Sequence, residues 1–186
     1  DNNECSEDTK TFNIYFSDDG MNNFEKIASV TDEYFLHLGL TNLKGAYFIT
    51  ALDRSENESV PSDTIYRDNC PFYELPNVFT PNKDGKNDLF TPFYSDGSIL
   101  NFDYNKCPRF LKSVIFNVFD RSGSKLFSYS SLEDIENGIY INWDGKDLNG
   151  NELPSGTYYY TADIIFDILD KENREKLIKG WVQILK

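Results

Sequence analysis

The loop after residue 80 carries three oxygen-bearing side chains at close spacing. Asn82, Asp84 and Asp88 lie around Gly85. Carboxylate and amide oxygens on a tight glycine-containing loop are the ligands that Ca²⁺ prefers. The match to an EF-type loop is partial, because Thr80 stands where the first Asp is expected and no Glu closes the loop. The loop is therefore a candidate Ca²⁺ site. We expect that the protein requires no cofactor.

A second interpretation of this loop needs no metal. Asn and Asp side chains also accept hydrogen bonds from nearby backbone N–H groups in Asx-turns. Another oxygen-rich loop, residues 144–151, admits the same two interpretations. Both remain open for the two loops: a Ca²⁺ ligand set, or turns closed by their own side chains.

The sequence does not favour catalysis. The chain has a single histidine, His37, and its alternating surroundings are typical of a packed or an exposed residue. A general base must reach the proton that it abstracts. No nucleophile elbow, phosphate-binding glycine loop or zinc-ligand spacing occurs in the sequence. We expect that the protein is not an enzyme.

Charge limits the partners of this chain and suggests where it divides. The 186 residues contain 18 Lys and Arg against 31 Asp and Glu, a formal net charge of −13. Nucleic acids require a basic surface, and anionic membranes repel an acidic one, so neither is expected as a partner. The net charge is −9 in residues 1–70 and −4 in residues 71–186. This shift predicts a domain boundary at residue 70.

The chain is expected to be part of something longer. No apolar run reaches the ~20 residues that span a bilayer. The sequence opens without an initiator Met and without a signal peptide. We expect a C-terminal piece, with further domains of the same polypeptide upstream.

Residues 1–70 read as short strands separated by turns. The expected strands are residues 11–16, 24–28, 33–38, 45–52 and 60–66, because apolar and polar residues alternate there. Residues 47–51 and 57–62 resemble a late strand and the following turn of a fibronectin type III domain. The resemblance implies a spacer module, from which no ligand follows.

Residues 71–186 are also rich in strands. The expected strands are residues 113–119, 125–127, 157–168 and 176–185. In the first of them Ile115 and Phe119 face away from the other apolar residues, which predicts a central strand covered on both faces. In the last strand Trp181 lies on one face, and Val182 and Ile184 lie on the other. The predicted fold is all-β: two antiparallel β-sandwich modules of the immunoglobulin or fibronectin type in tandem.

Four turn-forming blocks follow one another in the second half of the chain. They are residues 75–90, 119–123, 143–147 and 153–160. In this order and spacing they resemble the gliding-motility-associated C-terminal domain of Bacteroidota. That domain is the type B C-terminal signal class of the type IX secretion system. The resemblance covers residues 72–186.

This resemblance implies an export and sorting signal, recognised as a folded domain, at the end of a large gliding adhesin-like protein. The implied location is the cell surface or the medium, beyond the outer membrane. The implied partners are the type IX translocon and a PorP-type outer-membrane barrel. A sheet edge can accept a partner strand. Trp181 and Lys186 of the last strand are therefore the candidate partner-binding residues.

The chain has three cysteines, Cys5, Cys70 and Cys107. The last two bracket the first block of the resemblance. In an oxidising compartment a disulfide between Cys70 and Cys107 is expected to stabilise the domain by about 3–4 kcal/mol. Two buried free thiols are the alternative, and Cys5 would pair outside this segment.

A different function is also compatible with the sequence. A carbohydrate- or protein-binding β-sandwich of a surface adhesin would present exposed aromatic residues as a platform. Tyr94, Tyr104 and Tyr129 are the candidates.

Overall fold

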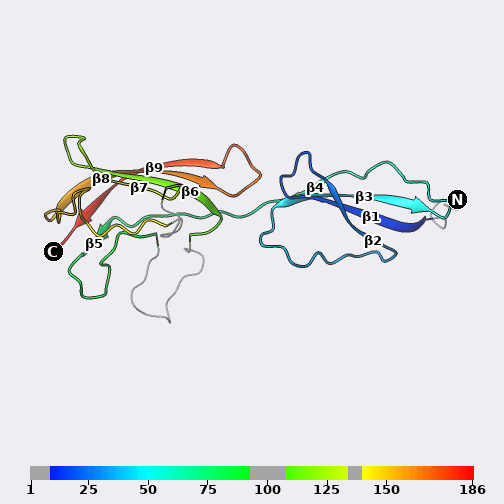
Figure 1. Cartoon of the computed structure of the whole chain (residues 1–186), viewed down its shortest axis with the longest axis horizontal. Helices are drawn as coiled ribbons and strands as arrows, with labels where there is room; N and C mark the ends of the chain where they lie inside the picture. Colours follow the sequence, from blue (N-terminus) through cyan, green and yellow to red (C-terminus); the bar gives the residue numbers. More distant parts are fainter. Residues whose placement is uncertain (1–8, 93–107, 134–139) are drawn as a thin grey trace. The chain divides into compact units, whose positions relative to one another are not determined.

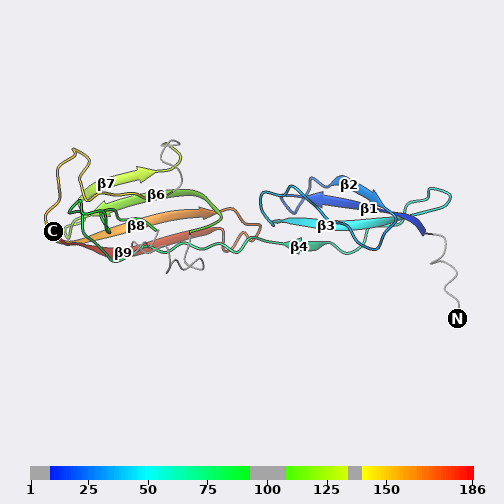
Figure 2. The same ribbon diagram turned by 90° about the horizontal axis from the view of Figure 1, so that it is seen from below.

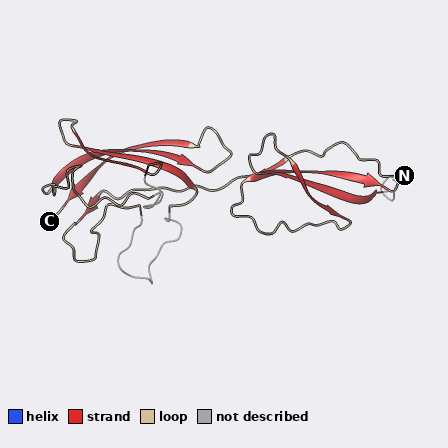
Figure 3. Cartoon of the chain, viewed as in Figure 1, coloured by secondary structure: helices blue, strands red, loops and turns tan. Residues whose placement is uncertain are grey.

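The computed structural model describes residues 9–92, 108–133 and 140–186. The chain divides into two compact units, Asp1–Asn69 and Cys70–Lys186 (Figure 1). Each unit is built on one β-sheet, and the described residues form no helix (Figure 3). The predicted all-β class is confirmed. It follows that no helix in the described ranges is long and apolar enough to cross a bilayer.

The first unit is a four-stranded sheet in the order β2-β1-β3-β4. Its strands are β1 (Thr9–Ser17), β2 (Glu25–Val30), β3 (Gly45–Asp53) and β4 (Ile65–Arg67), and every pairing is antiparallel. β1 lies between β2 and β3, and its alternating sequence gives it one apolar face. Ile14 of β1 and Ala46 of β3 are buried in this unit.

The prediction of a strand at residues 33–38 is wrong. Residues 31–44 pair with no strand in the described part of the chain. The side chains of Tyr34, Leu36 and Leu38 are exposed, while the His37 ring lies edge-on to Phe16, at 4.9 Å between centroids. The segment is therefore a loop that contacts the sheet through His37, and not a strand within the sheet.

The last strand of this unit is shorter than expected. The sequence predicts pairing from residue 60, but β4 begins at Ile65. Pro61 has no N–H to donate to a strand ladder. Serine hydroxyls take the place of strand carbonyls, since Ile49 N–H donates to Ser62 Oγ at 3.1 Å and Ala51 N–H donates to Ser59 Oγ at 2.9 Å.

The second unit is a five-stranded sheet in the order β5-β9-β8-β6-β7. Figure 2 shows the four longer strands side by side. The strands are β5 (Val78–Phe79), β6 (Leu111–Phe119), β7 (Lys125–Ser130), β8 (Gly156–Phe166) and β9 (Glu175–Ile184). All pairings are antiparallel except the short β5 with β9, which is parallel.

The core of this unit lies against one face of the sheet. Val114, Phe116 and Val118 of β6 are completely buried there. The covering layer comes mainly from segments outside the sheet, and its largest side chains are Phe90 and Trp143. These two residues exchange backbone hydrogen bonds of 2.8 and 3.1 Å. This two-residue bridge holds the layer together where no long strand does.

The opposite face of the sheet is exposed. β6 is central, as expected, but its second face is not covered, because Ile115 is 38% exposed. From Thr157 to the end of β8 the side chains alternate strictly between accessible and buried. In β9 Val182 and Ile184 are buried and Trp181 is exposed, which confirms the predicted division of faces.

Candidate functional site

The four sequence blocks meet at one end of the second sheet. Phe119, the last residue of β6, pairs with Tyr159 near the start of β8. Gly156, the first residue of β8, pairs with Ile184, the last residue of β9. Val78, inside the first block, pairs with Gln183, which precedes Ile184 in β9. The strand register therefore brings the blocks together beside the chain end (Figure 1).

Backbone hydrogen bonds connect these blocks directly. Leu148 N–H, in the loop that follows the third block, donates to the Leu126 carbonyl after the second block, at 2.9 Å. Leu153 N–H of the fourth block donates to the Gly145 carbonyl of the third, also at 2.9 Å. The bonds join residues 22 and eight positions apart in sequence and tie this end of the unit together.

An aspartate closes three tight turns in the same way. Asp53, Asp120 and Asp147 each accept hydrogen bonds from the backbone N–H groups two and four residues later, at 2.8–2.9 Å. The fourth residue of each turn, Glu56, Gly123 or Gly150, has a positive φ. The pattern is an Asx-turn followed by a left-handed residue.

Hydrogen bonding to these carboxylates stabilises their charged form. The Ser122 hydroxyl is the largest cause of the lowered pKa of Asp120. The side-chain amides of Asn57 and Asn151 are the largest causes for Asp53 and Asp147, whose pKa values are lowered as well. All three aspartates are half-buried, and their hydrogen-bond partners lie within the same turn.

The predicted calcium ligands are engaged with their own loop. Asp88 accepts the N–H groups of Lys83 at 2.5 Å and Gly85 at 2.7 Å through its two oxygens. Asp84 accepts the N–H of Lys86, and Asn82 Oδ1 accepts the N–H of Asp84. This is the turn-closing interpretation of the loop. In the described residues no three His, Cys, Asp or Glu side chains come together to hold a metal ion. A Ca²⁺ site stays a prediction.

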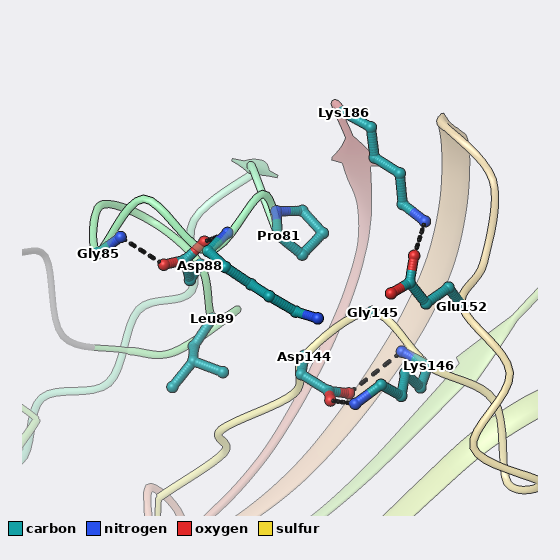
Figure 4. Close-up of a pocket in the computed structure, with 10 residues that line it drawn as sticks. Pro81, Gly85, Asp88, Leu89, Asp144, Gly145, Lys146, Glu152 and Lys186 are labelled. Carbon is teal, nitrogen blue, oxygen red and sulfur yellow. Dashed lines mark hydrogen bonds and ion pairs between the residues drawn. The ribbon is translucent and has the colours of Figure 1, made fainter.

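A pocket of about 310 Å³ opens at the same end of the unit (Figure 4). Residues of the first and third blocks line it together with Glu152 and the chain end: Pro81, Lys83, Gly85, Asp88, Leu89, Asp144, Gly145, Lys146, Glu152 and Lys186. Gly145 has a φ of 78°, and a Cβ there would lie 3.3 Å from the Phe79 ring. Glycine thus lets the chain turn tightly against the core at the pocket wall.

Two ion pairs lie in the pocket wall. Lys146 donates to Asp144, and Lys186 Nζ lies 2.9 Å from Glu152 Oε2 (Figure 4). The hydrogen bond from Lys186 is the main cause of the lowered pKa of Glu152, and Asp144 raises the pKa of Lys146. Both ion pairs lie at the surface, where they are suited to positioning chain segments.

The remaining predicted site residues lie apart from one another. Trp181 is on the exposed sheet face and does not line the pocket that includes Lys186. Cys70 is exposed, so the alternative of two buried thiols is wrong for this residue. Cys107 lies outside the described residues, and the disulfide stays a prediction. His37 is half-buried, and its Nδ1 is 2.9 Å from the Tyr47 hydroxyl.

The aromatic platform proposed from sequence has one described member. Tyr129 is partly buried and packs against the core, while Tyr94 and Tyr104 lie outside the described residues. Sequence reasoning missed Tyr159, which is exposed on the open sheet face. The alternation along residues 157–166 was a usable signal for this exposure.

Comparisons with known proteins agree with the block pattern. A family model for the CHU_C type IX secretion signal domain matches residues 73–184. None of the curated protein sequences matches the chain significantly. A crystal structure of a tetra-tandem repeat in the extending region of a large adhesion protein is similar at 12% identity and a TM-score of 0.42. The match covers 95% of this chain and 42% of that chain, and a score this low supports no inference. Since the family model spans more than half of the sequence, the chain belongs to the CHU_C type IX secretion signal domain family.

Proposed function

We propose that residues 70–186 are the C-terminal sorting signal of a gliding adhesin-like surface protein, which the type IX machinery reads as a folded domain. The family match over residues 73–184 carries this proposal. A signal of this family directs its protein across the outer membrane, to the cell surface or the medium. The domain has no catalytic role in the proposal: its surface is what the machinery binds.

The geometry of the second unit supports recognition of a folded shape. Its four sequence blocks are separate in the chain, and the register of the folded sheet brings them together. Trp143, of the third block, is buried in the core. A receptor that contacts this end would therefore distinguish the folded domain from an unfolded chain.

The proposed docking element is the outer edge of β9. Gln183 N–H points away from β8, because it donates to the Asn77 carbonyl at 2.9 Å. The register is continuous, so the N–H groups of Leu177, Lys179 and Trp181 point the same way. No described residue accepts a hydrogen bond from them. A strand from the translocon or from a PorP-type barrel would pair there, and Lys186 would contact the partner at the chain end.

The first unit is proposed to be a spacer of the fibronectin type III kind. Support comes from its four-stranded antiparallel sheet. It also comes from Ser59 and Ser62, whose hydroxyls accept hydrogen bonds from backbone N–H groups of β3. The carbohydrate-binding platform suggested for Tyr129 gains no support, because that ring packs against the core.

Export of a reporter tests the proposed function. A fluorescent protein with a periplasmic leader and residues 70–186 at its C-terminus is expected to reach the cell surface in a type IX-competent host. A host that lacks the translocon is expected to retain it. Immunofluorescence on intact cells measures the outcome. Retention of a folded fusion in the competent host would refute the proposal.

A variant with a disrupted core is the matched control. Trp143→Ala removes a large, fully buried side chain, which costs about 3–5 kcal/mol. The folded-shape mechanism predicts that this fusion is not exported. Full export of a fusion shown to be unfolded by circular dichroism would mean that a linear motif is the signal.

A further inference from the structure

An aromatic row crosses the exposed face of the second sheet. Phe119 of β6 pairs with Tyr159 of β8, and Tyr159 pairs with Trp181 of β9. Residues that pair directly share a face, with Cβ atoms about 4.5–5.5 Å apart. Tyr159 is 49% exposed and Trp181 is 48% exposed. Phe119 is half-buried, so the row presents two exposed rings and the edge of a third on a face where polar residues are the rule.

A row of hydrogen-bonding side chains lies directly beside the aromatic row. Asn117, Thr161 and Lys179 are its members on the same three strands, again in direct register. Ser128 of β7 extends this row and donates to Asn117 Oδ1 at 2.9 Å. The face thus offers rings next to amide, hydroxyl and ammonium groups.

The charge of this region differs in sign from the charge of the chain. Lys125 pairs with Phe119 at one end of the aromatic row, and Lys179 adjoins Trp181 at the other. Neither row contains an Asp or Glu, although the chain has a net charge of −13. The first carboxylate on this face is Asp163, opposite Leu177 in the following row. Two lysines beside exposed rings are complementary to an anionic ligand.

We propose that this face, the Phe119–Tyr159–Trp181 row with Lys125 and Lys179, binds an acidic polysaccharide. The C–H faces of sugar rings are attracted to the negative faces of aromatic rings. The polar row supplies partners for sugar hydroxyls, and the lysines pair with uronate carboxylates. The open sheet admits a polymer that extends beyond the site. The inference does not rest on the export function.

Calorimetric titration of the whole chain with polygalacturonate tests the proposal. Binding is expected in about 50 mM salt and is expected to weaken severalfold in about 500 mM salt, because salt screens exposed charges. Fully methyl-esterified polygalacturonate has the same backbone without the charge, and we expect weaker binding to it. Equal affinity for the two polymers would overturn the ionic part of the proposal.

Two pairs of variants separate the face from the rest of the surface. Tyr159→Ala is expected to weaken binding about tenfold, and Tyr159→Phe, which keeps the ring, is expected to bind like the wild type. Lys179→Gln is expected to weaken binding about three- to fivefold. Lys171→Gln, in the turn at the far end of β8 and β9, is expected to have no effect.

The outcomes are distinct. Thermal unfolding of each variant shows whether its fold is intact. No binding by the wild type, or binding unaffected by Tyr159→Ala and Lys179→Gln, refutes the proposal. Loss of reporter export in Tyr159→Ala, without any polysaccharide binding by the wild type, would assign the face to a protein partner instead. Export of the wild-type fusion is measured independently, so failure of either proposal leaves the other standing.

Discussion

At the scale of single residues, one repeated device shapes the tight turns. Asp53, Asp120 and Asp147 begin turns with the same hydrogen bonds, yet the residue in the left-handed position differs. It is glycine in the two turns of the second unit and Glu56 in the first unit, with a φ of 66°. A side chain in this conformation is strained, because Cβ approaches the following carbonyl.

Replacing Glu56 by glycine is expected to stabilise the first unit by about 0.5–1 kcal/mol, the relief of strain less the flexibility that glycine adds to the unfolded chain. Differential scanning calorimetry is the suitable measurement, since both tryptophans, Trp143 and Trp181, lie in the second unit and fluorescence would not report on the first.

The matched control is Gly123→Ala, which introduces the same strain into the second unit. We expect a loss of about 1 kcal/mol there. If Glu56→Gly lowers the melting temperature of the first unit, then Glu56 makes stabilising contacts that outweigh its backbone strain.

At the scale of elements, alternation predicted the strands that the core needs. β1, β3, β6, β8 and β9 lie within two residues of the expected ranges at both ends, because each alternates apolar and polar residues over a long run. The same rule was wrong for residues 33–38. There the apolar side chains of Tyr34, Leu36 and Leu38 are exposed, and the segment lacks the hydrogen-bonding neighbour that a strand needs.

Gly180 of β9 shows how closely two strands pack. A Cβ at this position would lie 2.5 Å from the Tyr160 hydroxyl and 2.6 Å from its ring carbon. Tyr160 is buried and cannot move aside easily. Gly180→Ala is therefore expected to destabilise the second unit by about 1–3 kcal/mol through overpacking, as measured by urea unfolding followed through tryptophan fluorescence.

Gly156→Ala, in the neighbouring strand, serves as the comparison. A Cβ there would make only ordinary contacts of 3.9 Å and longer. We expect a change of less than about 0.5 kcal/mol. Equal effects of the two substitutions would show that the loss comes from glycine replacement itself and not from the Tyr160 ring.

At the scale of the whole molecule, hydrogen-bonded carboxylates make the stability depend on pH. The pKa values of Asp53, Asp120 and Asp147 are lowered in the folded state, chiefly by side-chain hydrogen bonds. Their contribution is complete above the unfolded value of about 3.9 and is lost as the pH falls through the lowered folded values. The melting temperature is therefore expected to be steady from about pH 7 to 5 and to fall below about pH 4.

Asp120→Asn separates this effect from the relief of charge repulsion in an acidic chain. The amide does not titrate, so the variant should lose less stability between neutral and acidic pH than the wild type. Thermal unfolding by circular dichroism at both pH values measures the difference. An identical loss in both proteins would show that Asp120 is not linked to folding.

The sequence by itself determined the all-β class, most strands and the family, because these depend on local alternation and on blocks that are contiguous in the chain. It also identified the oxygen-rich loops. It did not determine whether their side chains accept hydrogen bonds from the backbone or coordinate a metal ion. Only the tertiary structure decided that Asp88 closes its own loop, that the four blocks meet at one end, and that Phe119, Tyr159 and Trp181 form one row. Strand register is the reason: it joins residues far apart in sequence, and a shift by one residue would turn each side chain to the other face.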